Sequence, residues 1–117
     1  MIRIKIYNMR KIDLMNVHMI EKKIQTELAS NPWISIPEEK ASFLFLAQQT
    51  ERKDEPVAIT IEAILPEDYE DNLPHKIAQV VGQAVSRVMA GWRKSAPSVE
   101  IVFKKLKDKE AAFCNVG

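Results

Sequence analysis

Residues 57–103 decide the fold: VAITIEAIL (57–65) is followed by NLPHKIAQVVGQAVSRVMAGW (72–92) and then by VEIVF (99–103). In the middle segment apolar residues recur every three or four positions, which places them in one stripe of a helix. The outer segments alternate along the chain, as strands with one buried face do. A strand, a long helix and a second strand predict a right-handed βαβ unit with parallel strands.

The predicted long helix has clear ends. Asn72 is a favourable N-cap residue, Pro74 fits the first turn, and Gly91 stands near the C-terminus, so we expect a helix from Leu73 to Trp92. Its inner face is expected to carry Ile77, Val80, Val81, Ala84, Val85, Val88 and Trp92.

The first half of the chain repeats this order. Isoleucines alternate with polar residues in a strand over 2–7, Asp13 is a plausible cap for a helix from Leu14 to Ala29, and SFLFLAQQ (42–49) is apolar on both faces. Two βαβ units predict a single α+β domain over 1–117. We expect a four-stranded mixed sheet with both helices on one face.

The other face of such a sheet would be uncovered. Depending on its orientation, SFLFLAQQ offers either Phe43 and Phe45 or Leu44 and Leu46 to that face. We expect these side chains beside Ile64 and Val102, in an apolar strip among Arg3, Lys5, Glu62 and Glu100. Such a strip is typical of a subunit contact, the alternative being a small surface patch.

The composition excludes several classes of protein. The formal net charge is +1, whereas nucleic-acid binders usually carry a basic excess, so we expect no nucleic-acid partner. No apolar run approaches the roughly 18 residues of a membrane span, and the start lacks a signal-peptide core. We expect a cytoplasmic protein with no membrane contact.

The histidines and the acidic cluster could in principle bind a metal ion, but their sequence context favours other roles. His18 and His75 have no partner at metal-ligand spacing and are expected on the surface. The acidic cluster of Glu67, Asp68, Glu70 and Asp71 lacks the central glycine of a calcium loop and precedes a helix N-terminus, where negative charge is favoured. We therefore predict no metal site.

The remaining reactive or charged residues lie at the end of the chain. Cys114 has no evident base beside it and is expected to be an incidental thiol that makes no internal disulfide. A basic run near the C-terminus is expected to be solvated; it consists of Lys104, Lys105, Lys107 and Lys109. With only Gly82, Gly91 and Gly117, the chain has no phosphate-binding loop, and we predict no cofactor.

The chain resembles the tautomerase superfamily, which contains macrophage migration inhibitory factor and the hydroxymuconate isomerases, and is nearest to an uncharacterised bacterial branch. The shared features are the N-terminal strand MIRIKI, Ile36-Pro37-Glu38-Glu39 leading into Ser42–Phe45, Glu55–Ala58 entering a strand, and a short tail with Phe113, Asn115 and Gly117. The resemblance implies a homotrimer whose sheets surround a central channel, with a small-molecule pocket between subunits.

One departure from the family concerns its catalytic residue. Active members use an amino-terminal proline as a general base in keto-enol isomerisation, but Ile2 stands after the initiator here and should leave Met1 in place. Met1 is thus only a positional candidate, and Ile36 replaces a pocket lysine. The resemblance implies a pocket lined by Met1, Ile36, Leu65, Glu100, Val102 and Phe113, with Glu100 and Val102 where the migration inhibitory factor has Tyr and Asn.

Two functions follow from the resemblance. The chain is either a tautomerase of weak or altered mechanism or a non-catalytic trimer that keeps the pocket. An alternative is a ferredoxin-like regulatory or ligand-binding domain, which would pair 42–49 with 57–65 as a hairpin. As an RNA-recognition domain it would need stacking aromatics that 57–65 lacks, and as an amino-acid-binding domain it would need a glycine after the first strand.

Overall fold

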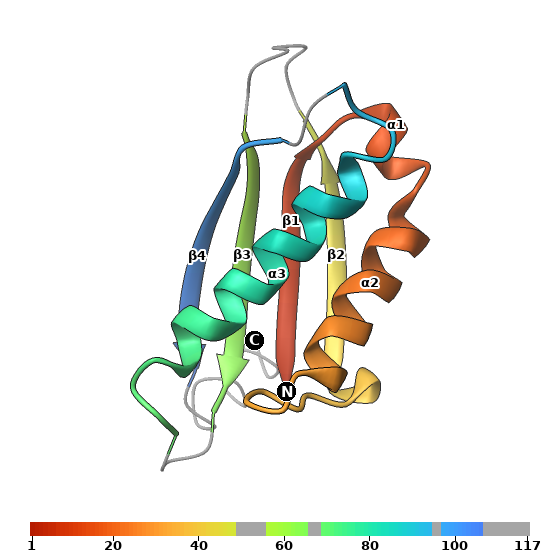
Figure 1. Cartoon of the computed structure of the whole chain (residues 1–117). Helices are drawn as coiled ribbons and strands as arrows, with labels where there is room; N and C mark the ends of the chain where they lie inside the picture. The colour runs from red at the N-terminus through yellow and green to blue at the C-terminus, as the bar shows by residue number, and fades with distance from the viewer. Residues whose placement is uncertain (49–55, 66–68, 95–96, 107–117) are drawn as a thin grey trace.

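A computed structural model describes residues 1–48, 56–65, 69–94 and 97–106 (Figure 1). The strands in these ranges are β1 (Ile2–Met9), β2 (Ala41–Ala47), β3 (Val57–Ile64) and β4 (Val99–Leu106). The helices are α1 (Lys11–Leu14), α2 (Val17–Ser30) and α3 (Leu73–Met89), with a 3-10 turn η1 (Glu38–Lys40). Helices α2 and α3 lie side by side on one face of the sheet, and no described element covers the other face.

The sheet has the strand order β2-β1-β3-β4. Strand β1 is parallel to β2 and antiparallel to β3, and β3 is parallel to β4. The predicted four-stranded mixed sheet with two internally parallel βαβ units is therefore confirmed. The ferredoxin-like alternative is wrong, because β2 is bonded to β1 and makes no hairpin with β3.

The core lies between this sheet and the two long helices. Both central strands point every second side chain toward the helices, and these side chains are at most 2% exposed: Ile2, Ile4, Ile6, Val57, Ile59, Ile61 and Ala63. The helices contribute Ile20, Ile24, Leu28, Ile77, Val81, Ala84, Val85 and Met89. The helical and strand periods in the sequence thus predicted which faces are buried.

The first predicted helix has different ends. The helix expected over 14–29 is divided into α1 and α2, because Asn16 adopts φ −119° and ψ 21° and interrupts the helical backbone. Asp13 is not the cap of a long helix. It lies inside α1, where its Oδ2 accepts a hydrogen bond from the backbone N–H of Arg10 at 2.8 Å.

The second predicted helix ends earlier than expected. Helix α3 stops at Met89, and residues 90–92 form a turn in which Gly91 N–H donates to the Val88 carbonyl at 3.0 Å. Asn72 occupies the N-cap position as predicted, but its side chain makes no capping hydrogen bond. Trp92 lies in this turn, where it packs against the core and its Nε1 donates a hydrogen bond to Asp13.

The expected apolar strip on the uncovered face is not continuous. Leu44, Leu46 and Val102 do point to this face and are 47%, 37% and 55% exposed, whereas Phe43 and Phe45 pack against the core. Because β1 and β3 are the central strands, however, the two leucines and the valine lie at opposite edges of the sheet. Between Leu44 and Val102 the same row contains Lys5 and Thr60. The strip is therefore two apolar edges with a charged centre.

Candidate functional site

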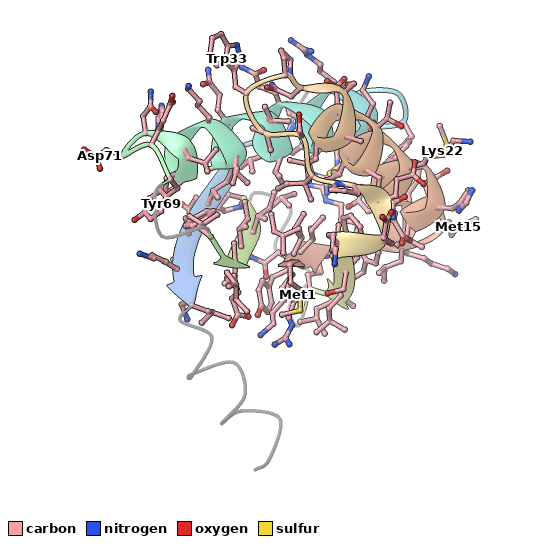
Figure 2. All side chains as sticks on the ribbon, turned by 90° about the horizontal axis from the view of Figure 1, so that it is seen from below. Met1, Met15, Lys22, Trp33, Tyr69 and Asp71 are labelled. Atoms are coloured by element: carbon pink, nitrogen blue, oxygen red, sulfur yellow. The ribbon has the colours of Figure 1, made fainter. Side chains whose placement is uncertain are left out.

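Three of the predicted pocket residues lie at one end of the sheet. Met1 is 51% exposed, and its carbonyl accepts a hydrogen bond from the N–H of Ile64 at 3.1 Å, which places Leu65, the residue after β3, close to it. Ile36 precedes η1 at the same end and bonds through its N–H to the Leu28 carbonyl at 3.0 Å. Figure 2 views this end directly, with Met1 on the side of the sheet away from the helices.

The other predicted pocket residues are remote from Met1 within one chain. Glu100 pairs with Ala58 and Val102 with Thr60, whereas the Met1 end of the sheet is level with Leu106. Six residues of strand separate Leu106 from Glu100, or about 20 Å. A single subunit thus does not bring the predicted residues together. Phe113 and Cys114 lie outside the described residues.

A group of charges occupies the centre of the uncovered face. Arg3 on β1 pairs with Glu62 on β3, which in turn pairs with Lys104 on β4, so their side chains form one row. Lys5, in the next row, places its Nζ 2.8 Å from Oε1 of Glu62. The close ammonium group of Lys5 lowers the pKa of Glu62 despite partial burial, and the charges of Arg3 and Lys104 lower it further.

This charge group was not predicted as a site. The alternation of Arg3 and Lys5 with buried isoleucines indicated that they share a face, but only the strand order shows that Glu62 and Lys104 lie beside them. We name Arg3, Lys5, Glu62 and Lys104 the charged centre.

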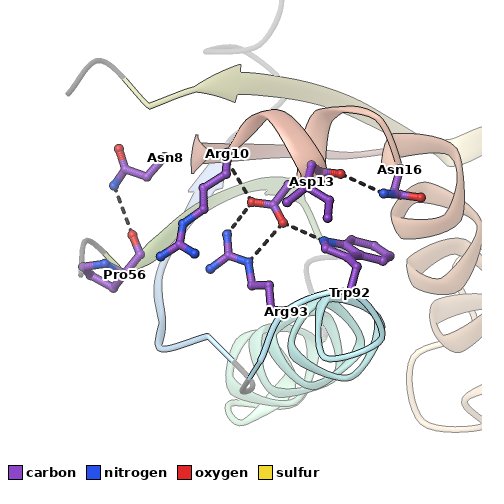
Figure 3. Close-up of polar contacts among 8 residues, drawn as sticks. Asn8, Arg10, Asp13, Asn16, Pro56, Trp92 and Arg93 are labelled. Atoms are coloured by element: carbon purple, nitrogen blue, oxygen red, sulfur yellow. Dashed lines mark hydrogen bonds and ion pairs between the residues drawn. The ribbon is translucent and has the colours of Figure 1, made fainter. Parts of the chain in front are cut away.

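A second polar group was also missed, at the opposite end of the sheet from Met1. Asp13 is fully buried, and its carboxylate accepts hydrogen bonds from Trp92 Nε1 at 2.8 Å, from Arg93 Nε at 3.1 Å and from Arg93 Nη2 (Figure 3). Burial raises the pKa of Asp13, but the hydrogen bonds from Arg93, Trp92 and Arg10, with the Arg93 charge, lower it on balance. The donors to the Asp13 carboxylate are Arg10, Trp92 and Arg93 of the same chain. This group therefore links α1 to the end of α3.

A groove of about 380 Å³ runs between α3 and β4. Its walls include Gln83, Ser86 and Arg87 from the helix and Val99 and Ile101 from the strand. Of the predicted pocket residues that the structure describes, none lines this groove, so the groove is not the predicted pocket.

The histidines and the acidic cluster, for which no metal site was predicted, lie mostly on the surface. His18 and His75 are both exposed, as predicted. Among the described residues no group of three or more His, Cys, Asp or Glu side chains could hold a metal ion. Glu70 pairs with Lys76 at 3.2 Å and Asp71 is exposed, while Glu67 and Asp68 lie outside the described residues. In the described part of the chain, no helix has the length and apolar character needed to cross a membrane.

Known proteins are similar to this chain in structure rather than in sequence. No family model matches the sequence, and no curated protein matches it either. Solved structures match over most of the chain. The crystal structure of native fused 4-OT has a TM-score of 0.68 at 13% identity, with 92% of this chain and 89% of that chain covered.

Two further similar structures come from named organisms. Macrophage migration inhibitory factor of Toxoplasma gondii has a TM-score of 0.57 at 12% identity, with 90% of each chain covered. A protein of unknown function from Vibrio cholerae has a TM-score of 0.61 at 14% identity, covering 91% of this chain and 78% of that one. The chain has the tautomerase and macrophage migration inhibitory factor superfamily fold, as the sequence resemblance predicted.

Proposed function

We propose that this chain forms a homo-oligomer, most simply a trimer, that binds a small molecule where two subunits meet. The observation that carries the proposal is the exposure of Leu44 and Val102, on opposite edges of the sheet face that no described element covers. Exposed apolar side chains on both edges favour a contact in which one edge of a subunit meets the other edge of the next.

The pocket is proposed to combine residues from two chains. Met1, Ile36 and Leu65 would come from one subunit, and Glu100 and Val102 from its neighbour, because within one chain Val102 lies about 13 Å and Glu100 about 20 Å along β4 from the end of the sheet that holds Met1. Phe113 of either chain is a further candidate. Similar structures described as symmetric and asymmetric trimers of fused 4-OT make a trimer the simplest choice.

The function we favour is ligand binding without the proline-dependent isomerase reaction. We expect Met1 to offer a primary amine in place of the family's catalytic proline, and the apolar Ile36 replaces a lysine that the resemblance would place in the pocket. A weak or altered isomerase activity is the alternative within the same pocket. We place the protein in the cytoplasm, as expected from the sequence.

Sedimentation equilibrium tests the assembly. We expect a mass that is a multiple of 13.4 kDa and that shifts toward the monomer in Val102→Lys. Met15→Lys is the matched control, because Met15 is 76% exposed but lies at the end of α1, away from the uncovered face. A wild-type mass of 13.4 kDa at all concentrations would contradict the proposal.

Phenylpyruvate, a generic enolisable acid, probes the pocket. In a nitrogen-15 NMR titration it should perturb the amide signals of Leu65 and of Val102 together in the wild type. In a monomeric Val102→Lys variant the two regions should no longer respond together. Perturbation of one region alone in the wild-type oligomer would contradict a pocket shared between subunits.

A further inference from the structure

We propose that the charged centre of the uncovered face binds a small multivalent oxyanion through Arg3, Lys5 and Lys104. All three cations belong to one chain, so this binding does not require the oligomer proposed above. The site differs from the predicted pocket, of which neither Arg3 nor Lys104 is a member.

The backbone fixes the position of each cation. Arg3, Glu62 and Lys104 occupy directly paired positions on β1, β3 and β4, so the two cations stand on either side of the carboxylate. Neighbouring strands are about 4.8 Å apart, which places the Cα atoms of Arg3 and Lys104 about 10 Å apart. Their long side chains can both reach one ligand a few ångströms wide. Ser42 continues the row on β2 and adds a hydroxyl donor.

The charges within this centre do not balance. Glu62 is the single carboxylate in its row and is paired with Lys5, whose Nζ lies 2.8 Å away. Three cations around one carboxylate leave a local excess of positive charge. The other acidic residue that faces this side on the described strands is Glu100, four residues from Lys104 along β4 and so about 13 Å away.

The surroundings strengthen the attraction for an anion. The side chains of Lys5 and Glu62 are only 27% and 15% exposed, and the exposed apolar Leu44 and Val102 flank the Lys5 row at the two edges. Partial burial lowers the local dielectric, so each charge interacts more strongly than in bulk water. Guanidinium and ammonium groups together favour phosphate-like or polycarboxylate oxygens over a monovalent halide.

A bound anion would also reduce the free-energy penalty of desolvating a cation when subunits assemble. The proposed edge-to-edge contact would remove water from Lys104, which lies on the edge strand β4, and burying a charge without its full counter-charge is strongly unfavourable. A bound oxyanion would offset that cost. The proposed site and the proposed interface are therefore compatible on one face.

The test is an NMR titration of the full chain with inorganic phosphate, at an ionic strength held constant with sodium chloride. The amides of Arg3, Glu62 and Lys104 should shift in a saturable manner. Arg3→Gln and Lys104→Gln should each weaken binding by about tenfold, the scale of one charge-assisted hydrogen bond. Lys22→Gln, an exposed lysine on α2, is the control and should leave binding unchanged.

Glu62→Gln gives the decisive result, because it removes the competing carboxylate. An anion site predicts tighter phosphate binding in this variant, whereas a purely structural ion pair predicts only lower stability. The proposal is overturned if Glu62→Gln fails to tighten binding, or if Lys22→Gln weakens it as much as Lys104→Gln does. Lys104 lies on an edge strand and is exposed, so its variant remains informative even if Arg3→Gln does not fold.

Discussion

The indole Nε1 of Trp92 donates a hydrogen bond to Oδ1 of Asp13 at 2.8 Å, joining α1 to the turn after α3 across 79 positions of sequence. Arg93 completes the group with an ion pair to the same carboxylate, and its side chain is only 8% exposed. The first and second βαβ units are thus linked by a buried polar group as well as by the apolar core.

Asp13→Asn should destabilise the protein by about 3 kcal/mol, because it leaves the nearly buried guanidinium of Arg93 without its counter-charge. Urea unfolding monitored by circular dichroism measures the loss. Asp71→Asn removes an exposed carboxylate and should change the free energy of unfolding by less than about 0.5 kcal/mol. Equal effects of the two substitutions would show that the buried group adds no stability.

The pH dependence of stability should also depend on Asp13. Its pKa in the folded chain lies below the ordinary aspartate value of about 3.9, so the ionised carboxylate stabilises the fold above that value. This contribution is lost as the pH falls from about 4 toward the lower folded pKa. Glu62 and Glu27 act in the same direction, since their pKa values are lowered too.

The comparison of wild type with Asp13→Asn isolates the aspartate contribution to acid sensitivity. Urea unfolding over the range of about pH 2 to 7 should show a shallower acid decline for the variant than for the wild type. Parallel declines in the two proteins would mean that the Asp13 pKa is not lowered by folding.

Gly82 should couple to Ile101 in a double-mutant cycle. A Cβ built on Gly82 would stand 2.6 Å from Cδ1 of Ile101, because β4 passes close to α3 at this point. Gly82→Ala alone should therefore lose much of the roughly 1 kcal/mol that alanine gains in a helix. In an Ile101→Val background, which lacks Cδ1, the same substitution should stabilise by about that amount. Thermal or urea unfolding of the four proteins gives the coupling energy, and additive effects would contradict the steric explanation.

The sequence was sufficient for elements whose evidence is local. The alternation of Ile2, Ile4 and Ile6 and the stripe from Ile77 to Val85 both identified buried faces, because each period is repeated within a single strand or helix. Strand order was the harder step. The expected strip of Leu44 with Val102 assumed that their strands were neighbours, whereas β1 and β3 separate them.

Polar contacts between residues far apart in the sequence could not be predicted from local sequence patterns. Asp13 stands ahead of an apolar periodic run and so has the signature of a helix cap, yet two of its partners are 79 and 80 positions away. Likewise, Glu62 and Lys104 meet Arg3 only after the sheet forms. The composition of the predicted pocket stays a prediction, since a single chain does not bring its two groups of residues together.

We expect the protein to show no keto-enol isomerase activity, because of what Met1 and Ile36 provide. Proton transfer to or from carbon needs a positioned base and a donor that stabilises the enolate. Met1 offers an amine on a half-exposed residue, and Ile36 offers no donor in its side chain. Absence of a positioned base typically costs about 10²- to 10⁴-fold in rate, so we expect phenylpyruvate enol to decay as in buffer alone. Ultraviolet absorbance follows this decay, with chain acetylated at its amino terminus as the control. A rate well above buffer that acetylation abolishes would show that the Met1 amine serves as the base.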